Sequence, residues 1–377
     1  MPWQEVSTMD QRREFVALAR CNGANLSQLC RRYKISRPTA YKWLKRFDSE
    51  GLEALADQAR RPHASPMRSA KELEAQVVGL REARPCWGAR KIHRRLRELG
   101  FTSLPAVSTI HAILRRNGCI SSEKIHQGPG QRFEHEAPND LWQMDFKGHF
   151  PMSSGRCHPL TILDDHSRFS LAVDACSNER AQTVRTSLER VFALYGLPKQ
   201  ILTDNGGPWG NQSERPHTRL TVWLMRLGID VIHGRPHHPQ TQGKIERFHR
   251  TLKAEALRDC FYADLRHAQR GLDQFRNIYN HERPHDSLGG DVPAAHYALS
   301  DRNFPASLPP IEYGPDDLVR KVQLKGEIYY KNRPYIISRA LHGQPVALRP
   351  TYEEHVFEVY FCQTRITQID LQQPKEA

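Results

Sequence analysis

From about residue 137 the sequence alternates between strand-like and helix-like patterns, and this order constrains the fold more than any other feature of the chain. Short apolar runs are typical of strands, and longer amphipathic runs are typical of helices. In chain order the patterns predict strands at 141–150, 159–167 and 168–176, a helix at 179–194, a strand at 200–207, a helix near 218–227, a strand at 229–234 and a helix from about 241. The order βββαβαβα predicts an α/β domain over 137–300, with a mixed sheet and helices packed on it.

The first 50 residues have a wholly helical pattern. Residues 10–47 contain three short helical segments, and in the third Ser36 is expected to cap the helix while Pro38 lies early, where a missing N–H costs nothing. This outline predicts a helix-turn-helix DNA-binding domain over 1–50. Its third helix would present donors to base edges or phosphates in a major groove: Arg37, Thr39, Lys42 and Arg46. A small helical bundle with a solvated basic face is the alternative.

Residues 51–69 lose this periodicity and are expected to form a linker. Because Pro62 favours extended backbone before it, Arg60 and Arg61 would either lie in a minor groove, which attracts arginine, or belong to a solvated tether. Helical patterns resume over 70–120 and predict a second helix-turn-helix domain. Basic residues crowd its middle helix, among them Arg90, Lys91 and Arg94. Two such modules in tandem would read a longer DNA site than one.

The C-terminal part has the pattern of a small β domain. Over 318–372, apolar and polar residues alternate in short runs that are broken at Gly326, at 332–334 and at Gly343. This predicts a small antiparallel all-β barrel, which could serve in DNA binding or in protein contacts. The chain is therefore expected to be multidomain, with all-α modules, an α/β core and an all-β barrel.

The charge of the chain favours an anionic partner. Its 377 residues include 55 Lys and Arg against 42 Asp and Glu, a formal net charge of +13, so nucleic acid is the first expectation. No apolar stretch approaches the roughly 20 residues that cross a bilayer, and the opening MPWQEVSTMDQRREF is not a secretory segment. The eight cysteines include no CxxC pair, which argues against a zinc ribbon and a disulfide framework. We expect a cytoplasmic protein with no membrane partner.

Three acidic residues stand out by their surroundings in the α/β domain. Asp145 lies inside an apolar strand, Asp204 at a strand end before Asn205, and Glu246 within a helix. A carboxylate inside a sheet is costly unless it is paired or binds a cation. Each has an ordinary alternative when taken alone: Asp204 could open a turn, and Glu246 could be a solvated helix residue.

The helix that carries Glu246 is amphipathic. At 3.6 residues per turn, Ile245, Phe248 and Leu252 share one face that can pack on the sheet. A neighbouring stripe holds Glu246, Arg250 and Lys253, which suits a metal held beside a phosphate backbone. The alternative is an exposed ion pair between Glu246 and Arg250, which contributes only a few tenths of a kcal/mol.

Three segments resemble, in order, the catalytic segments of insertion-sequence transposases of the retroviral-integrase-like DDE superfamily: WQMDFKG, ILTDNGGPW and HHPQTQGKIERFHRTLK. Tyr279–Asn280, the run 283–285 and Leu288 resemble the segment that follows the core in these proteins. The interval between Asp204 and Glu246 is longer than usual in the family, and Trp209 stands where many relatives carry phenylalanine. The zinc-binding module at the N-terminus of retroviral integrases is absent.

The resemblance implies a ribonuclease-H-like core in which Asp145, Asp204 and Glu246 bind two magnesium ions, for which manganese can substitute. Two such ions about 3.5–4 Å apart would activate a nucleophile and stabilise the leaving oxygen. Asp145 would bridge the two ions, with Asp204 on one and Glu246 on the other. Residues around the third segment would contact DNA: His237, Gln240, Lys244, Arg250 and Lys253. Asp164 and Asp165 are expected to have structural roles.

The implied activity is that of a DNA transposase. It would bind the terminal repeats of its element as double-stranded DNA, cleave 3′ ends and transfer them into target DNA, as a dimer or a larger assembly on the bacterial nucleoid. A catalytically silent DNA-binding regulator derived from a transposase is the alternative. An RNA-cleaving nuclease of the same fold is disfavoured by the two helical modules.

Overall fold

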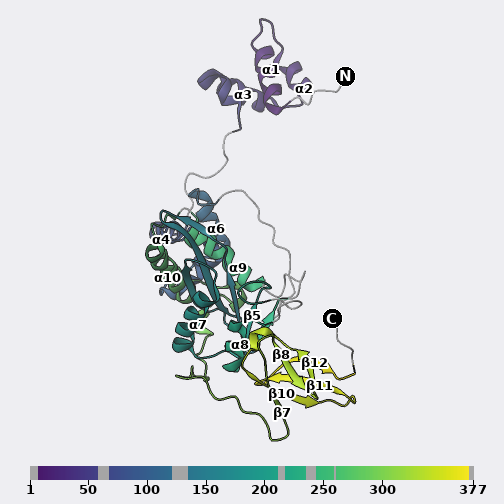
Figure 1. The fold of residues 1–377 in the computed structure, drawn as a ribbon. Helices are drawn as coiled ribbons and strands as arrows, with labels where there is room; N and C mark the ends of the chain where they lie inside the picture. Colours follow the sequence, from purple (N-terminus) through teal and green to yellow (C-terminus); the bar gives the residue numbers. More distant parts are fainter. Residues whose placement is uncertain are drawn as a thin grey trace. The chain divides into compact units, whose positions relative to one another are not determined.

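The computed structural model describes residues 7–57, 68–120, 135–210, 217–234, 243–258 and 260–372. The chain divides into two compact units, Met1–Arg68 and Ser69–Ala377 (Figure 1). The first unit is helical. The second contains three further helices, a mixed sheet covered by helices, and a C-terminal set of antiparallel strands. No helix in these ranges is long and apolar enough to cross a membrane.

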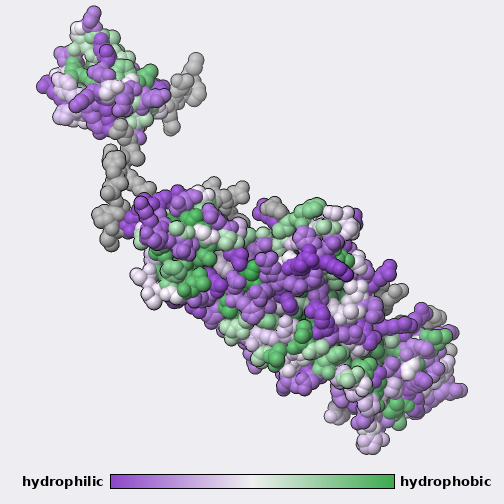
Figure 2. All heavy atoms as spheres, turned by 90° about the vertical axis from the view of Figure 1, so that its left-hand side faces the viewer, coloured by the Kyte–Doolittle hydropathy of each residue, from purple (hydrophilic) through white to green (hydrophobic). Residues whose placement is uncertain are grey.

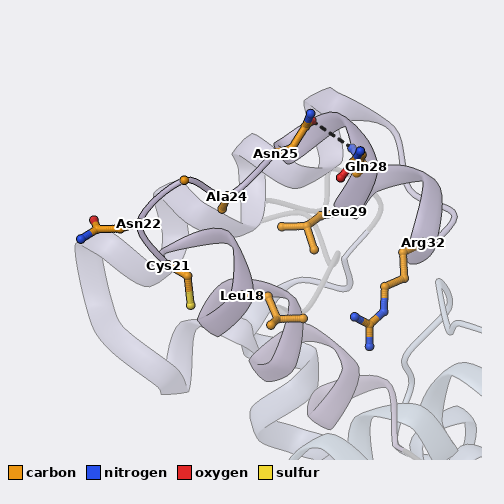
Figure 3. Close-up of a pocket in the computed structure, with 9 residues that line it drawn as sticks. Leu18, Cys21, Asn22, Ala24, Asn25, Gln28, Leu29 and Arg32 are labelled. Atoms are coloured by element: carbon orange, nitrogen blue, oxygen red, sulfur yellow. Dashed lines mark hydrogen bonds between the residues drawn. The ribbon is translucent and has the colours of Figure 1, made fainter.

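The first unit is a three-helix arrangement made of α1 (Thr8–Ala19), α2 (Leu26–Arg32) and α3 (Arg37–Glu50). As predicted, Ser36 caps α3: its side chain accepts a hydrogen bond from the backbone N–H of Thr39, and proline lies in the first turn. Gly51 ends the helix at a positive φ of 78°. The core of this unit is built around Phe15, Val16 and Trp43. Figure 3 shows the shallow hollow between α1 and α2, where Asn25 caps α2.

The second helical module belongs to the larger unit. It consists of α4 (Lys71–Ala83), α5 (Ala89–Glu98) and α6 (Val107–Arg116). Trp87 and the apolar faces of α5 and α6 form its core, against which Ile278 of α10 (Leu265–His281) also packs. The module therefore shares apolar contacts with the α/β domain that follows it.

The central sheet has six strands: β1 (Leu141–Phe146), β2 (Phe150–Met152), β3 (Gly155–Asp164), β4 (Ser170–Cys176), β5 (Gln200–Thr203) and β6 (Asp230–His233). The long strand β3 pairs antiparallel with β2, β4 and β1, and β1, β5 and β6 run parallel. The predicted mixed sheet is confirmed, with the ribonuclease-H-like order β4-β3-β1-β5-β6. The single strand expected over 141–150 is instead two strands, because the chain turns at Gly148, where φ is 84°.

The two faces of the sheet are covered by different helices. Trp142 and Met144 of β1 pack with α7 (Ala181–Tyr195) and α8 (Arg219–Arg226) in the main core. Leu163 and Val173 pack on the other face, against α9 (Gly243–Leu252) and α10. Because side chains alternate along a strand, residues 143 and 145 of β1 point to the α9 face.

The C-terminal strands form an all-β domain, as predicted. They are β7 (Leu318–Lys321), β8 (Glu327–Tyr330), β9 (Arg333–Ile336), β10 (Pro345–Pro350), β11 (Val356–Phe361) and β12 (Thr364–Asp370). They pair as a four-stranded sheet in the order β12-β11-β10-β7 and a two-stranded sheet β8-β9, around one apolar core. Val222 and Met225 of α8 belong to the same core.

The surface of the protein is mostly hydrophilic on the face drawn in Figure 2, with small apolar groups between the hydrophilic residues.

Candidate active site

Asp145 and Asp204 are brought together by two neighbouring parallel strands. Leu141, Trp142 and Gln143 of β1 pair with Gln200, Ile201 and Leu202 of β5, in that order. Continued by two residues, this register sets Asp145 beside Asp204, which directly follows β5. Neighbouring strands lie roughly 4.8 Å apart, so the two carboxyl groups share one end of the sheet.

The two carboxyl groups are held in a poorly solvated and mutually repulsive environment. Burial raises the pKa of Asp145 to about 7, and the charge of Asp204 adds to the rise. Burial also raises the pKa of Asp204, while the nearby His233 opposes this rise. The Oδ1 atom of Asp204 is buried and has no hydrogen-bond partner. An arrangement of this kind favours a bound cation, which would relieve both the repulsion and the unsatisfied oxygen.

Glu246 lies on α9, whose apolar face packs on the sheet as predicted. Ile245, Phe248 and Leu252 are buried, whereas Glu246, Arg250 and Lys253 are exposed. Glu246 makes no ion pair with Arg250. The alternative that Glu246 serves only as one half of an exposed ion pair therefore does not apply. Among the described residues, no three His, Cys, Asp or Glu side chains converge as a metal site. The structure thus pairs Asp145 with Asp204 and leaves Glu246 exposed to solvent on α9.

His249 links the helix of Glu246 to the strand of Asp145, which the sequence analysis did not anticipate. The hydroxyl of Thr161 donates to the backbone carbonyl of Asp145 at 2.9 Å, and His249 Nε2 lies 2.7 Å from the same hydroxyl. Because a hydroxyl has one proton to donate, His249 must donate from Nε2. Its Nδ1 then faces the Asp145 carboxylate at 3.8 Å.

The structure places the predicted DNA contacts of the first module on a helix with one exposed stripe. Arg37 and Lys42 are exposed, whereas Thr39 is part-buried beside Ser36 and the guanidinium of Arg46 stacks on the Trp43 ring at 5.0 Å. Tyr41, which sequence reasoning missed, is 61% exposed on the same stripe. The signal available in the sequence was an aromatic residue in a helix that is otherwise rich in basic residues.

In the larger unit, several predicted DNA contacts have partners within the protein. Arg94 forms an ion pair with Asp291 at 2.5 Å, and Lys244 forms one with Asp165 at 2.5 Å. Burial lowers the pKa of Lys91, and Arg90 is exposed. Four further predicted contacts lie outside the described residues: Arg60, Arg61, His237 and Gln240. The DNA contacts therefore stay predictions.

Comparison with known protein families agrees with this arrangement. The integrase core domain matches residues 135–239, and a second integrase core domain family matches 227–293. A homeodomain-like domain matches 39–114 and a helix-turn-helix domain matches 11–63. The C-terminal domain of the IS481 family transposases matches 317–377.

Individual relatives come from mobile elements. An uncharacterized protein of insertion element IS476 from Xanthomonas euvesicatoria is 26% identical over 76% of this chain and 81% of its own length. One of insertion element IS407 from Burkholderia multivorans is 25% identical over 63% of this chain and 86% of its own. Among solved structures, the catalytic core domain of BIV integrase is 23% identical with a TM-score of 0.32, covering 42% of this chain and 92% of that one.

The central sheet has the ribonuclease-H-like strand order, and separate segments of the chain are similar to an integrase core domain and to helix-turn-helix domains. The C-terminal match and the insertion-element relatives make the chain similar to the insertion-sequence transposases.

Proposed function

We propose that the protein is a DNA transposase that cleaves 3′ ends of its element and transfers them into target DNA with a divalent metal ion. The observation that carries this proposal is the pairing of Asp145 with Asp204. Two carboxyl groups with raised pKa values, one with an unpartnered buried oxygen, stand at the end of adjacent parallel strands. That arrangement is unfavourable for stability, and a metal-binding role accounts for it.

The chemistry of these donors fits magnesium. Asp145 and Asp204 offer hard carboxylate oxygens, and no cysteine is among them, so magnesium or manganese is expected rather than zinc. Glu246 is the expected third donor, from α9. When bound, the metal ions supply the positive charge that favours attack on a phosphodiester and departure of its oxygen.

The remaining residues of the site hold the carboxyl groups and the DNA. Thr161 and His249 hold the strand of Asp145 against α9. Arg250 is exposed on the helix of Glu246 and Lys253 is exposed at the start of the π-helical turn that follows it, where both could meet a phosphate backbone. The exposed stripe of α3 is the expected reader of the terminal repeats. Since two ends must be joined together, we expect a dimer or larger assembly on DNA, in the bacterial cytoplasm.

The test is cleavage and joining of labelled DNA that carries the flanks of the encoding gene. Wild-type protein should process 3′ ends and transfer them with magnesium, and should bind without cutting in calcium. Asp145→Asn should lower both rates by at least about a thousandfold, since it removes a metal donor from the site. A gel-shift assay should show unchanged DNA binding by this variant.

Asp140→Asn is the matched control. Asp140 lies just before the same strand and pairs with Lys199 at 2.7 Å, away from the site. This variant should keep wild-type rates. Binding without any cutting by wild-type protein would support the regulator instead, and cleavage of RNA alone would point to a nuclease.

A further inference from the structure

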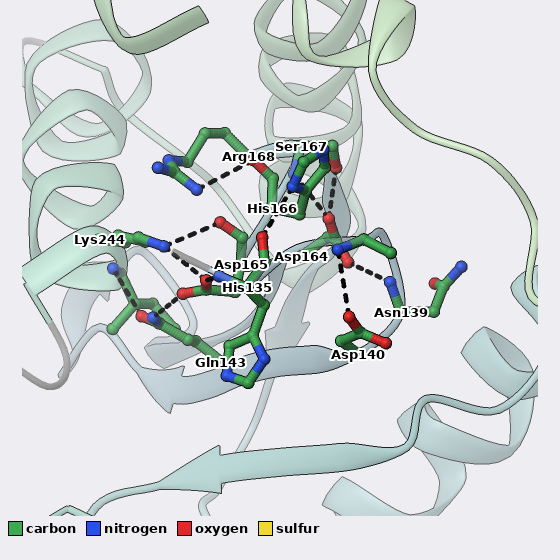
Figure 4. A network of polar contacts seen from close by, with 12 residues as sticks. His135, Asn139, Asp140, Gln143, Asp164, Asp165, His166, Ser167, Arg168 and Lys244 are labelled. Atoms are coloured by element: carbon green, nitrogen blue, oxygen red, sulfur yellow. Dashed lines mark hydrogen bonds and ion pairs between the residues drawn. The ribbon is translucent and has the colours of Figure 1, made fainter. Parts of the chain in front are cut away.

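Asp165 is a completely buried carboxylate in the turn after β3, and it stands outside the carboxylate pair described above. Its Oδ2 accepts from the ammonium of Lys244 at 2.5 Å and from the backbone N–H of His135 at 3.0 Å. Its Oδ1 accepts from the side-chain amide of Gln143 at 2.8 Å. Lys244 also donates to the backbone carbonyl of Asp165 at 3.1 Å. Both carboxylate oxygens are thus occupied within the protein (Figure 4).

Gln143 joins this carboxylate to α9. Its side-chain oxygen accepts a hydrogen bond from the backbone N–H of Ile245 at 3.1 Å. Ile245 lies in the first turn of α9, where N–H groups have no partner inside the helix. Gln143 therefore caps α9 from a strand of the sheet, and its amide can do so only in one orientation because Nε2 donates to Asp165.

The positions of these residues in the sequence relate them to the site. Gln143 precedes Asp145 by two residues and points to the same face of β1. Lys244 precedes Glu246 by two residues in the first turn of α9. The three side chains Gln143, Asp165 and Lys244, here called the latch, therefore connect the strand of one predicted metal ligand to the helix of another.

We propose that the latch is a positioning device that fixes the start of α9 against β1 and so sets where Glu246 stands relative to Asp145. The catalytic part of this inference rests on the proposed function. Its mechanical part, that the latch holds the first turn of α9, stands independently of any activity.

Asp165→Asn is the variant that tests the latch. It keeps an oxygen to accept from Gln143 but replaces the other oxygen with an NH2 group facing Lys244 and the N–H of His135. The Lys244 ammonium and the His135 N–H, both hydrogen-bond donors, then face another donor, and Lys244 loses its ion pair with Asp165. The first turn of α9 should loosen.

Asp164→Asn is the matched control, because the neighbouring Asp164 is the last residue of β3 and is equally buried. Its carboxylate accepts from the N–H and hydroxyl of Ser167 and from the N–H of Asn139, and none of these belongs to α9. A loss that is only structural should appear in both variants to a similar extent.

The first readout is hydrogen exchange of the peptide spanning 243–252 in the full chain without metal. Asp165→Asn should raise its exchange rate about tenfold, and Asp164→Asn should leave it within about twofold. Gln143→Leu leaves the Lys244–Asp165 pair in place and should raise the same exchange rate, which covers the case in which Asp165→Asn does not fold. Equal exchange at α9 in the Asp164 and latch variants would overturn the proposal.

The second readout is the magnesium concentration that half-saturates strand transfer. It should rise about tenfold in Gln143→Leu and Asp165→Asn, with unchanged DNA binding, and stay at the wild-type value in Asp164→Asn. An active wild type whose latch variants keep wild-type magnesium dependence would overturn the positioning role. Wild-type protein with no strand transfer would count against the proposed function, whereas the exchange experiment would still decide the latch.

Discussion

His285 is buried against the ring of Tyr279, with ring centroids 4.7 Å apart, and its Nε2 has no hydrogen-bond partner. Burial lowers its pKa to about 2, and the nearby Arg283 adds to the effect. An unfolded chain binds a proton on this histidine below about pH 6.5, and the folded chain does not. The contribution of His285 to stability is therefore fully present above that pH and is lost as the pH falls, by up to about 1.4 kcal/mol per unit.

His285→Phe should remove this dependence while keeping the edge-to-face contact with Tyr279. Relative to wild type, the free energy of unfolding of the variant should rise by about 2 kcal/mol between pH 7 and pH 5. Urea unfolding at both pH values measures it. A difference in the free energy of unfolding that stays constant across this range would show that His285 binds its proton equally well in the folded and unfolded chains.

Thr161 and His249 give a prediction at the same scale. His249→Leu removes the donor to the Thr161 hydroxyl, and losing a buried hydrogen bond costs about 1–3 kcal/mol. If this cost raises the energy of the transition state, the rate of strand transfer should fall roughly tenfold to a hundredfold. His249→Gln can place an amide donor near the position of Nε2 and should keep strand transfer within about fivefold of wild type. Similar rates for the two variants would contradict a role for this donor.

A candidate site residue can be picked out from the sequence where its side chain contradicts the local pattern. Asp145 was conspicuous because it interrupts an apolar strand. Gln143 and His249 were not, because a glutamine in a strand and a histidine on a helix break no rule. Their importance comes from partners far away in sequence, Ile245 for Gln143 and Thr161 for His249, which only the fold brings within hydrogen-bond distance.

At the scale of elements, local chemistry was informative about helix ends and less so about strand ends. Ser36 capped α3 as expected, since an N-cap depends on residues only a few positions away. The strand predicted over 141–150 breaks at Gly148, and its two parts, β1 and β2, pair with successive stretches of the continuous strand β3. Pairing of this kind is set by distant residues.

The exposed stripe of α3 leads to an element-scale prediction about DNA binding. Lys42 and Lys45 are exposed and lie on the same side of the helix as Tyr41. If each contacts a phosphate, Lys42→Ala and Lys45→Ala should each weaken binding to all sequences and reduce the slope of log K against log salt by about 1. Fluorescence anisotropy at several salt concentrations measures this, and unchanged slopes would move the DNA interface off this stripe.

At the scale of the whole molecule, the two helical modules differ in a way that their sequences did not reveal. The second module is tied to the core by ion pairs of Arg84 and Arg95 with Glu282 and of Arg94 with Asp291. Both modules have similar basic helical patterns, so the sequence predicted two DNA-reading modules in tandem. Acidic partners nearly two hundred residues away are not visible to a local pattern.

This difference predicts how the chain unfolds. Phe15 lies in the core of the first unit and Trp87 in that of the second module, and both are almost completely buried. Replacing either residue with alanine should lower the free energy of unfolding of the core that contains it by about 3–5 kcal/mol. Because the first unit has its own core, Phe15→Ala should destabilise Met1–Arg68 alone, whereas Trp87→Ala should lower the stability of the second module and the integrase-like core together. Hydrogen exchange in increasing denaturant distinguishes these regions, and a Trp87→Ala variant that loosens only α4 to α6 would show that the second module unfolds independently of the core.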